Sequence, residues 1–436
     1  MQRRSLEDYA ITFPKFSWPK SLPLYVIIVL PTLDSDLYFL HQWISLLQVI
    51  GTEQMALPAQ PGAVGDDSSP PILRLAEDLL AKIFLLLPAL ADVESTAAAC
   101  PAFRRVVADR SFLRLLRRAH LHRAPFVGFL FCKFHPAEAP HSSAPCARAL
   151  ERAADLSFSY IHSTGSFTRW FPLDARDGRV VLGHGSSSSF VVCDPLYRRC
   201  LLLPPIPEPG AARQCPFLFP AKGDEAETSF KLGCMAEFEP GLMLCLVFSS
   251  STGQWSNLRS DGILSKPKPF YACGCFYWKL TPDMLLVLDT RAMAMGFDVV
   301  EIPSTYGERD FVVAEAGEGR TGIFSLRHSY ARAASSLICA VKQGGGAGVN
   351  WQYKRRLSLP PRFRYAFAGA SDRHLLLHGS PWNHQEKASD ENSDSGSGYF
   401  SVESHTMKIE KVCGLRVLVD AVPYTSFPPS LCLPSI

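Results

Sequence analysis

The sequence lacks an excess of charge of either sign, and this absence excludes one broad class of function. Its 436 residues include 44 Lys and Arg against 41 Asp and Glu, which leaves a net charge of +3. A dedicated nucleic-acid binder usually carries a strongly basic domain or a basic stripe along one face. We therefore expect no nucleic-acid partner.

C-x-x-C motifs and glycosylation sequons are also absent. The thirteen cysteines are odd in number and include no C-x-x-C; the nearest pair is Cys273 and Cys275, which we expect on one face of a strand. No N-x-[ST] sequon occurs. Disulfide frameworks are built from paired cysteines in oxidising compartments. The pattern therefore predicts reduced thiols and a location in the cytoplasm or nucleus.

No apolar run is long enough to cross a bilayer, which needs about 20 residues. Two runs near the N-terminus are shorter, Leu22–Leu33 with two prolines inside it and Leu37–Ile50. Residues 1–55 have three interpretations: a helix packed on the rest, a segment at a membrane surface, or a segment outside the folded protein. We favour the third, because residues 56–71 have linker composition and Met55 would make an ordinary translation start. Detection of peptides from residues 15–50 in the endogenous protein would contradict a translation start at Met55. We expect no membrane partner.

Catalytic and cofactor motifs are equally scarce. The chain has no P-loop, no G-x-G-x-x-G and no H-E-x-x-H. The segment Gly183–Ser186 is not followed by a nucleophile elbow, so it predicts a turn between strands. His120 and His122 lack the further ligands of a metal site. We expect no cofactor, no metal and no catalytic activity.

The segment from Ile72 to about Leu121 has helical periodicity. Its large apolar residues recur three or four positions apart, and Pro88 and Pro101 interrupt the pattern. Asp92 is a candidate N-cap for the helix after Pro88. We predict a small three-helix domain over residues 72–118.

The remainder, residues 126–436, has a different pattern. Short apolar runs of β type alternate with Gly, Pro, Asp and Ser, and we predict an all-β domain, hence a multidomain α+β chain. Residues 383–398 are polar and acidic, which predicts a disordered loop.

A turn-centred unit repeats within the β region. It consists of an apolar strand, a polar turn and another strand, and its copies lie at residues 192–195, 248–255, 287–290, 341–351 (degenerate) and 400–404. The average spacing of about 50 residues is typical of kelch-type propeller blades. Radial closure of a propeller also protects strand edges. The alternative is an irregular pair of β-sandwiches.

Two parts of the sequence resemble a known family. The segment Leu75–Pro88 (LAEDLLAKIFLLLP) resembles the opening of an F-box, and residues 93–112 resemble its second half. Ala76, Pro101 and Phe103 stand where that family more often has Pro, a basic residue and Trp. The rest is similar to plant F-box proteins with a C-terminal F-box-associated β domain, through residues 193–199, 201–207 and 427–431.

The resemblance implies a substrate-recognition subunit of an SCF-type cullin–RING ubiquitin ligase. The F-box would bind a Skp-type adaptor, and through it a cullin, while the β domain would bind an unknown target protein. A 45-residue helical module is too small for a robust core of its own, so a partner would complete its apolar surface. The implied adaptor-binding residues are Leu75, Leu79, Leu80, Ile83, Phe84, Leu87, Pro88, Val93, Ala97, Phe103 and Val106.

Two alternatives stay open. The leucine stripe could instead pack on the chain's own β domain. The protein could also be a β-propeller hydrolase or carbohydrate-binding protein, which would need several carboxylates or histidines at the central channel; the strands supply few. Generic candidates for target contacts are Trp170, Trp255, Trp278, Trp351 and Arg355, although most such tryptophans pack between blades.

Overall fold

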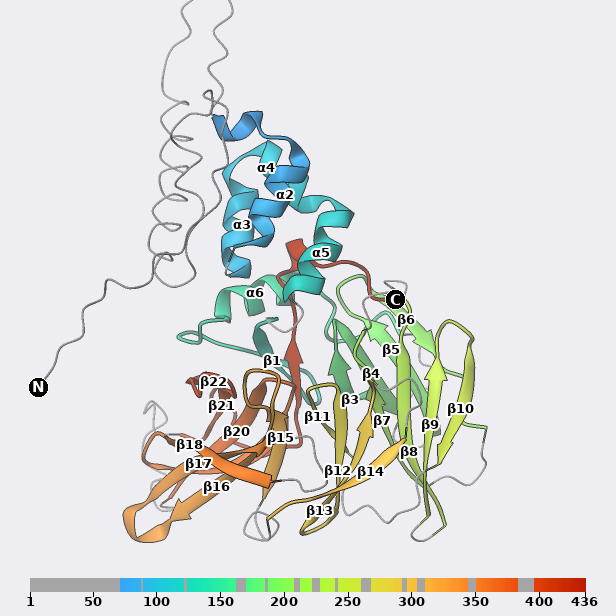
Figure 1. The fold of residues 1–436 in the computed structure, drawn as a ribbon, viewed down its shortest axis with the longest axis vertical. Coiled ribbons are helices and arrows are strands. Elements are labelled where there is room, and N and C mark those ends of the chain that lie inside the picture. The colour runs from blue at the N-terminus through green and yellow to red at the C-terminus, as the bar shows by residue number, and fades with distance from the viewer. Residues whose placement is uncertain are drawn as a thin grey trace, which may run out of the picture.

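The computed structural model has two parts, a helical module and a β-propeller below it (Figure 1). It describes residues 71–436 except 88, 121–123, 162–169, 185–186, 208–211, 222–227, 240–241, 260–267, 292–295, 304–309, 344–349 and 383–395. The predictions for residues 1–55, for nearly all of the 56–71 linker and for most of the 383–398 loop lie outside the described residues.

The helical module (residues 71–120) has four α-helices in its described part, not the predicted three, and it extends two residues beyond 118. They are α2 (Glu77–Leu85), α3 (Leu90–Ala99), α4 (Pro101–Ala108) and α5 (Arg110–His120), preceded by the 3₁₀ turn η2 (Pro71–Arg74).

Local chemistry explains where the helices of this module begin. Pro101 takes the first position of α4, where a missing N–H costs nothing, and the thiol of Cys100 accepts a hydrogen bond from the Phe103 amide at 3.4 Å. The Asp109 carboxylate accepts hydrogen bonds from the amides of Ser111 and Phe112, at 2.9 and 3.2 Å, and so caps α5. α3 begins at Leu90, so Asp92 lies in its first turn and not at the N-cap.

The β region is a propeller of six sheets. Blade 1 is β3 (Trp170–Arg176), β4 (Arg179–His184), β5 (Ser187–Asp194) and β6 (Arg199–Leu202). Blade 2 is β7 (Ala212–Leu218), β8 (Lys231–Glu239), β9 (Leu242–Ser249) and β10 (Gln254–Arg259). Blade 3 is β11 (Phe270–Ala272), β12 (Cys275–Thr281), β13 (Met284–Asp289) and β14 (Phe297–Glu301).

The second half of the ring continues this order. Blade 4 is β15 (Phe311–Glu315), β16 (Thr321–Ser329), β17 (Ala334–Gln343) and β18 (Asn350–Ser358). Blade 5 is β19 (Phe363–Ala370), β20 (His374–Pro381), β21 (Gly398–Glu403) and β22 (Ile409–Cys413). Blade 6 has three strands, β23 (Val422–Thr425), β1 (Phe126–Leu130) and β2 (Phe134–Pro136).

The ring is closed by strands from the two ends of the β region. β1 pairs antiparallel with β23, so that Leu130 lies opposite Val422 and Phe126 opposite Thr425. The first or innermost strands contact their neighbours at β3–β7, β11–β15, β15–β19, β19–β23 and β23–β3. This topology confirms the propeller, and the β-sandwich alternative is wrong.

The repeated turn units occupy the same position in every four-stranded blade. They lie between the third and fourth strands, for example between β5 and β6 in blade 1 and between β9 and β10 in blade 2. The degenerate copy at residues 341–351 begins in β17 and ends in β18, although residues 344–349 lie outside the described residues. The repeat predicted from the sequence is therefore the outer hairpin of the blades.

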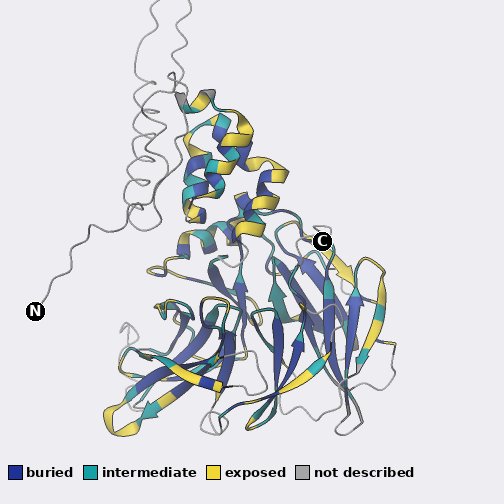
Figure 2. Ribbon diagram, in the orientation of Figure 1, coloured by how far each residue is buried: buried dark blue, intermediate teal, exposed yellow. Residues whose placement is uncertain are grey.

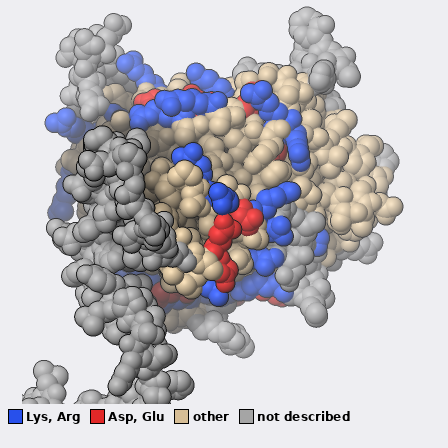
Figure 3. All heavy atoms as spheres, turned by 90° about the horizontal axis from the view of Figure 1, so that it is seen from above, with Lys and Arg blue, Asp and Glu red and all other residues tan. Residues whose placement is uncertain are grey.

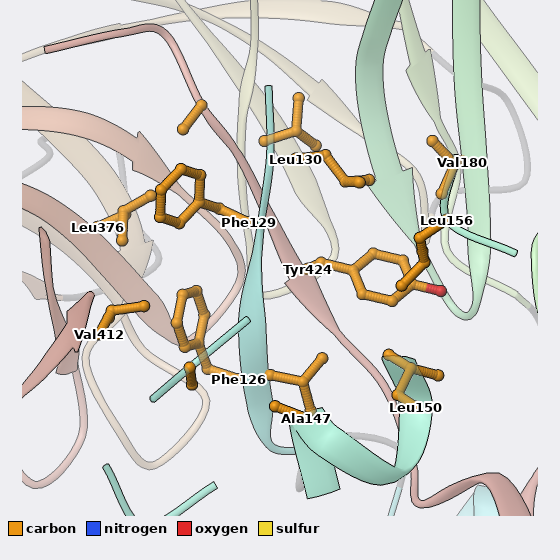
Figure 4. Close-up of a cluster of buried hydrophobic side chains, with 14 of the residues drawn as sticks. Phe126, Phe129, Leu130, Ala147, Leu150, Leu156, Val180, Leu376, Val412 and Tyr424 are labelled. Atoms are coloured by element: carbon orange, nitrogen blue, oxygen red, sulfur yellow. The ribbon is translucent and has the colours of Figure 1, made fainter. Parts of the chain in front are cut away.

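Two local expectations for the β region are wrong. The region is not all-β, because α6 (Ala144–Ala153) follows β2 and packs Ala147 and Leu150 against the closing blade (Figure 4). Cys273 and Cys275 do not share a strand face either. Cys273 and Gly274 form the tight turn between β11 and β12, with φ of 51° and 81°, which is the backbone of a two-residue hairpin loop.

The strands are buried where blades face one another, as Figure 2 shows for the propeller interior. Around the closing blade, Phe126 and Phe129 of β1 and Tyr424 of β23 form one buried cluster with Leu376 and Tyr399 of blade 5. Figure 4 shows Phe126, Phe129 and Tyr424 pointing into this cluster from the paired strands. Aromatic packing on both faces of the β1–β23 pair thus reinforces ring closure.

Candidate functional site

Helix α2 is apolar on two faces, and only one of them is buried. Leu80 and Phe84 lie on the inner face and are 3% exposed. Leu79 and Leu86 lie on the outer side, with exposed fractions of 44% and 82%, and Ile83 between them is partly buried. Positions 79, 83 and 86 follow the i, i+4, i+7 spacing of one helical stripe. We call Leu79, Ile83 and Leu86 the outer stripe.

The predicted adaptor-binding residues divide according to these two faces. Six are buried in the module's own core: Leu80, Phe84, Leu87, Val93, Phe103 and Val106. Leu75, Ile83 and Ala97 are partly buried, Leu79 is exposed, and Pro88 lies outside the described residues. As adaptor contacts all of them stay a prediction, but the six buried side chains are placed to support the module and not to touch a partner.

The buried face is organised around aromatic packing. The ring of Phe84 meets that of Phe103 edge-on at 5.2 Å between centroids and that of Phe112 at 6.5 Å. Such edge-to-face pairs add to the stability that burial provides. Leu86, the most exposed leucine of the stripe, was missed as a site residue; it was hidden in the run Leu85-Leu86-Leu87, whose three members point in different directions.

The alternative that the leucines of α2 pack on the chain's own β domain must be considered separately for the buried and the outer face. The core that contains Leu80 and Phe84 is completed by three residues after the last strand, Phe427, Leu431 and Leu433. No propeller strand contributes to this cluster in the part of the chain that the structure describes. Leu79 and Leu86 remain exposed.

Most of the exposed charged side chains of the module are basic. Arg104 and Arg105 on α4, and Arg110, Arg114 and Arg118 on α5, are exposed. Figure 3, which looks down on this end of the molecule, shows Lys and Arg spread around a small acidic group. The exposed pair Arg105–Glu77, at 3.6 Å, contributes little to stability because both side chains remain in water.

A second candidate site lies at the mouth of the propeller channel below the module. Arg176 at the end of β3 pairs with Asp372 at 2.6 Å and lies 4.2 Å from the centre of the Tyr271 ring. Asp174 and Lys268 line the same cavity of about 130 Å³. Burial raises the pKa of both Asp174 and Asp372, although the Arg176 guanidinium opposes that shift.

These channel carboxylates were not expected from the sequence, yet their bonding is structural. Asp174 Oδ2 accepts a hydrogen bond from the Leu218 amide at 2.7 Å, and Asp177 Oδ2 accepts one from the Ala221 amide at 2.8 Å. Asp372 is held by Arg176. These contacts tie blade 1 to blades 2 and 5.

A groove of about 600 Å³ borders the closing blade, and His141 and His374 are among the residues that line it. Burial lowers the pKa of His374 to about 4, and it also lowers the pKa of His141. His141 Nε2 lies 2.9 Å from the Ser401 hydroxyl, and its Nδ1 accepts a hydrogen bond from the Ser143 amide. Within the described residues, no group of three or more His, Cys, Asp or Glu side chains could hold a metal ion.

The four tryptophans suggested for target contacts lie in strands. Trp278 is fully buried and Trp351 nearly so, while the indole nitrogens of Trp351 and Trp255 donate to the carbonyls of Glu301 and Pro204. Trp170 is partly buried in β3, and Arg355 in β18 donates to the His405 carbonyl. These residues pack within and between blades, as most such tryptophans were expected to do.

Gly183 and His184 end β4, and His184 pairs with Ser187 of β5. The rest of the predicted turn, residues 185–186, lies outside the described residues. His120 is buried, with Nε2 3.3 Å from the Leu85 carbonyl, so it joins α5 to α2; His122 lies outside the described residues. No helix among the described residues is long and apolar enough to cross a membrane.

No protein-family model and no curated protein sequence matches this chain. Among solved structures it is similar to hydrazine synthase from Kuenenia stuttgartiensis, at 10% identity and a TM-score of 0.32 over 58% of this chain and 69% of that one. It is also similar to YjhT, at 12% identity and a TM-score of 0.31 over 59% of this chain and 87% of that one. A prolyl endopeptidase is similar at 13% identity and a TM-score of 0.32, over 86% of this chain and 60% of that one. TM-scores in this range assign no function; the strand pairing of this chain itself establishes the propeller.

Proposed function

We propose that this chain is a substrate receptor of an SCF-type ubiquitin ligase. The helical module acts as an F-box that binds a Skp-type adaptor and through it a cullin. The propeller takes the target protein, and the chain carries out no chemistry of its own.

One observation carries the proposal: the outer stripe of α2 is apolar, and two of its three residues, Leu79 and Leu86, are exposed. A helix needs one apolar face to join its own module, and α2 already uses Leu80 and Phe84 for that purpose. A second stripe at helical spacing, with Leu86 82% exposed, is the pattern with which amphipathic helices dock on a partner. Leu79, Ile83 and Leu86 lie within the segment that resembles the F-box opening.

The test is the affinity of the full chain for a purified Skp-type adaptor, measured by calorimetry or biolayer interferometry. The variant is Leu79→Asp with Leu86→Asp. Both side chains are exposed, so the module keeps its fold, and removing two apolar anchors costs roughly 2 kcal/mol each. We expect the Kd to rise by about 100-fold or more.

The matched control is Leu202→Asp. Leu202 is an exposed leucine on β6 of the propeller, so it reproduces the chemical change away from the module. Its Kd should stay within about twofold of the wild-type value. An unchanged Kd for the double variant, with its helical circular dichroism intact, would rule out the outer stripe as the docking surface.

A further inference from the structure

Residues 427–436, which follow β23 after Ser426, connect the two parts of the molecule. They leave β23 in the closing blade, rise to the base of the helical module and end beside β6 of blade 1 (Figure 1). We infer that residues 427–436, which we call the C-terminal strap, complete the core of the helical module and fix it on the propeller.

The first half of the strap is part of the module's core. Phe427, Leu431 and Leu433 are buried and belong to the same cluster as Leu80, Phe84 and Val93. The short 3₁₀ turn η6 (Pro429–Leu431) contacts α4 and α6, and Ser430 Oγ donates a hydrogen bond to Glu94 of α3 at 2.7 Å. A module of about 50 residues buries too little surface to be robust alone, and these side chains enlarge its core.

The second half of the strap is anchored in blade 1 by buried charged groups. The amide and the hydroxyl of Ser435 both donate to Asp194 Oδ2 at 2.7 Å, and Arg179 Nε donates to the Ser435 carbonyl at 2.8 Å. Asp194 and Arg179 are 2% and 3% exposed. Hydrogen bonds to charged groups are the stronger kind, and burial strengthens them further because water cannot compete for their donors and acceptors.

Blade 1 presents these anchors in a fixed position. Asp194 Oδ1 accepts hydrogen bonds from the amides of Leu196 and Tyr197 at 3.1 Å, so the carboxylate is oriented by its own turn. Tyr197 in turn donates from its hydroxyl to the Cys432 carbonyl at 2.9 Å. Ile436 then packs against the cluster between blades 1 and 2. The strap is thus held in the module core at one end and in blade 1 at the other.

The strap gives the helical module a second connection to the propeller. Domains joined by one chain connection alone move relative to each other by default. Here the module is also held by the strap, whose contacts lie more than 300 residues away in sequence from α2. The stability of the docking module therefore depends on residues at the far end of the chain, independently of what the module binds.

The test is amide hydrogen exchange, followed by mass spectrometry, on the full chain carrying Phe427→Ala and Leu431→Ala. Removing two buried side chains opens the module, and exchange in peptides from α2 to α4 should accelerate by at least about tenfold. Peptides from blades 2 and 3 serve as the internal reference and should exchange at the wild-type rate. The matched control is Val417→Ala with Leu418→Ala, two exposed apolar residues between the last two blades.

If the double variant also loses protection in blades 2 and 3, exchange is measured instead on the single variant Leu433→Ala, which perturbs the chain less. Faster exchange in α2 to α4 alone is again the expected result. Module exchange at the wild-type rate in a folded strap variant would overturn the inference. Adaptor affinity is measured separately. The exchange result tests whether the strap stabilises the module, and the Kd tests whether the module binds the adaptor, so either can fail without the other.

Discussion

At the scale of residues, the sequence predicts which positions of α2 are apolar but not which way they face. Leu79 and Leu80 are neighbours in the chain, yet one is exposed and the other buried. Because α2 is apolar over more than half of its circumference, periodicity alone marks two overlapping stripes. The six core residues were therefore grouped with the outer ones, and Leu86 was overlooked.

Alanine substitution should separate the two faces. We expect Leu80→Ala to lower the stability of the module by about 2–5 kcal/mol, because it leaves a cavity beside Phe84 and Phe103. Leu79→Ala should cost less than about 1 kcal/mol. Urea unfolding followed by circular dichroism at 222 nm measures both; equal losses for the two variants would contradict the assigned faces.

His374 makes stability depend on pH in a defined window. Its pKa is about 4 in the folded protein, below the usual 6.5, because burial against Phe126 disfavours the charged form. The unfolded chain therefore binds more protons between pH 6.5 and 4, and stability falls as the pH is lowered through that range. We expect a loss of about 2–3 kcal/mol from this residue. Urea midpoints from pH 7 to pH 4 should fall less steeply for His374→Gln; parallel slopes would argue against the assignment.

At the scale of elements, regular patterns were predictable and isolated ones were not. The outer hairpins of the blades repeat, so their turns stand out in the sequence. α6 (APCARALERA) is built mainly from alanine and arginine and has no strong apolar stripe, although Ala147 and Leu150 are buried. The strap (FPPSLCLPSI) has its apolar residues separated by prolines, so no periodicity reveals that they enter a core.

The closing blade depends on a glycine. Gly128 in β1 has φ of +148°, and an added Cβ would lie 2.2 Å from the His135 carbonyl oxygen of β2. The register between β1 and β23 shifts at this residue. We expect Gly128→Ala to destabilise the propeller by about 3 kcal/mol or more, through both clash and backbone strain.

Gly253→Ala is the control for that substitution. Gly253 also has a positive φ, of +70°, but an added Cβ would meet nothing within 4 Å, so only about 1 kcal/mol of strain is expected. Thermal unfolding of both variants measures the difference. A Tm of Gly128→Ala equal to that of Gly253→Ala would show that the closing blade tolerates the added carbon.

At the scale of the whole molecule, the division into a helical module and a repetitive β domain could be predicted, but its closure could not. β1 and β23 pair across almost 300 residues of chain, and no local pattern specifies such a partner. The charged channel mouth was missed for the same reason, because Arg176 and Asp372 meet only when blades 1 and 5 are brought together.

We propose above that the helical module connects this chain to a ligase scaffold. The most direct measurement is quantitative mass spectrometry of the tagged full chain purified from cells under native conditions. We predict that a Skp-type adaptor and a cullin co-purify, each at about one copy per chain. Recovery of the folded chain with neither protein would contradict it.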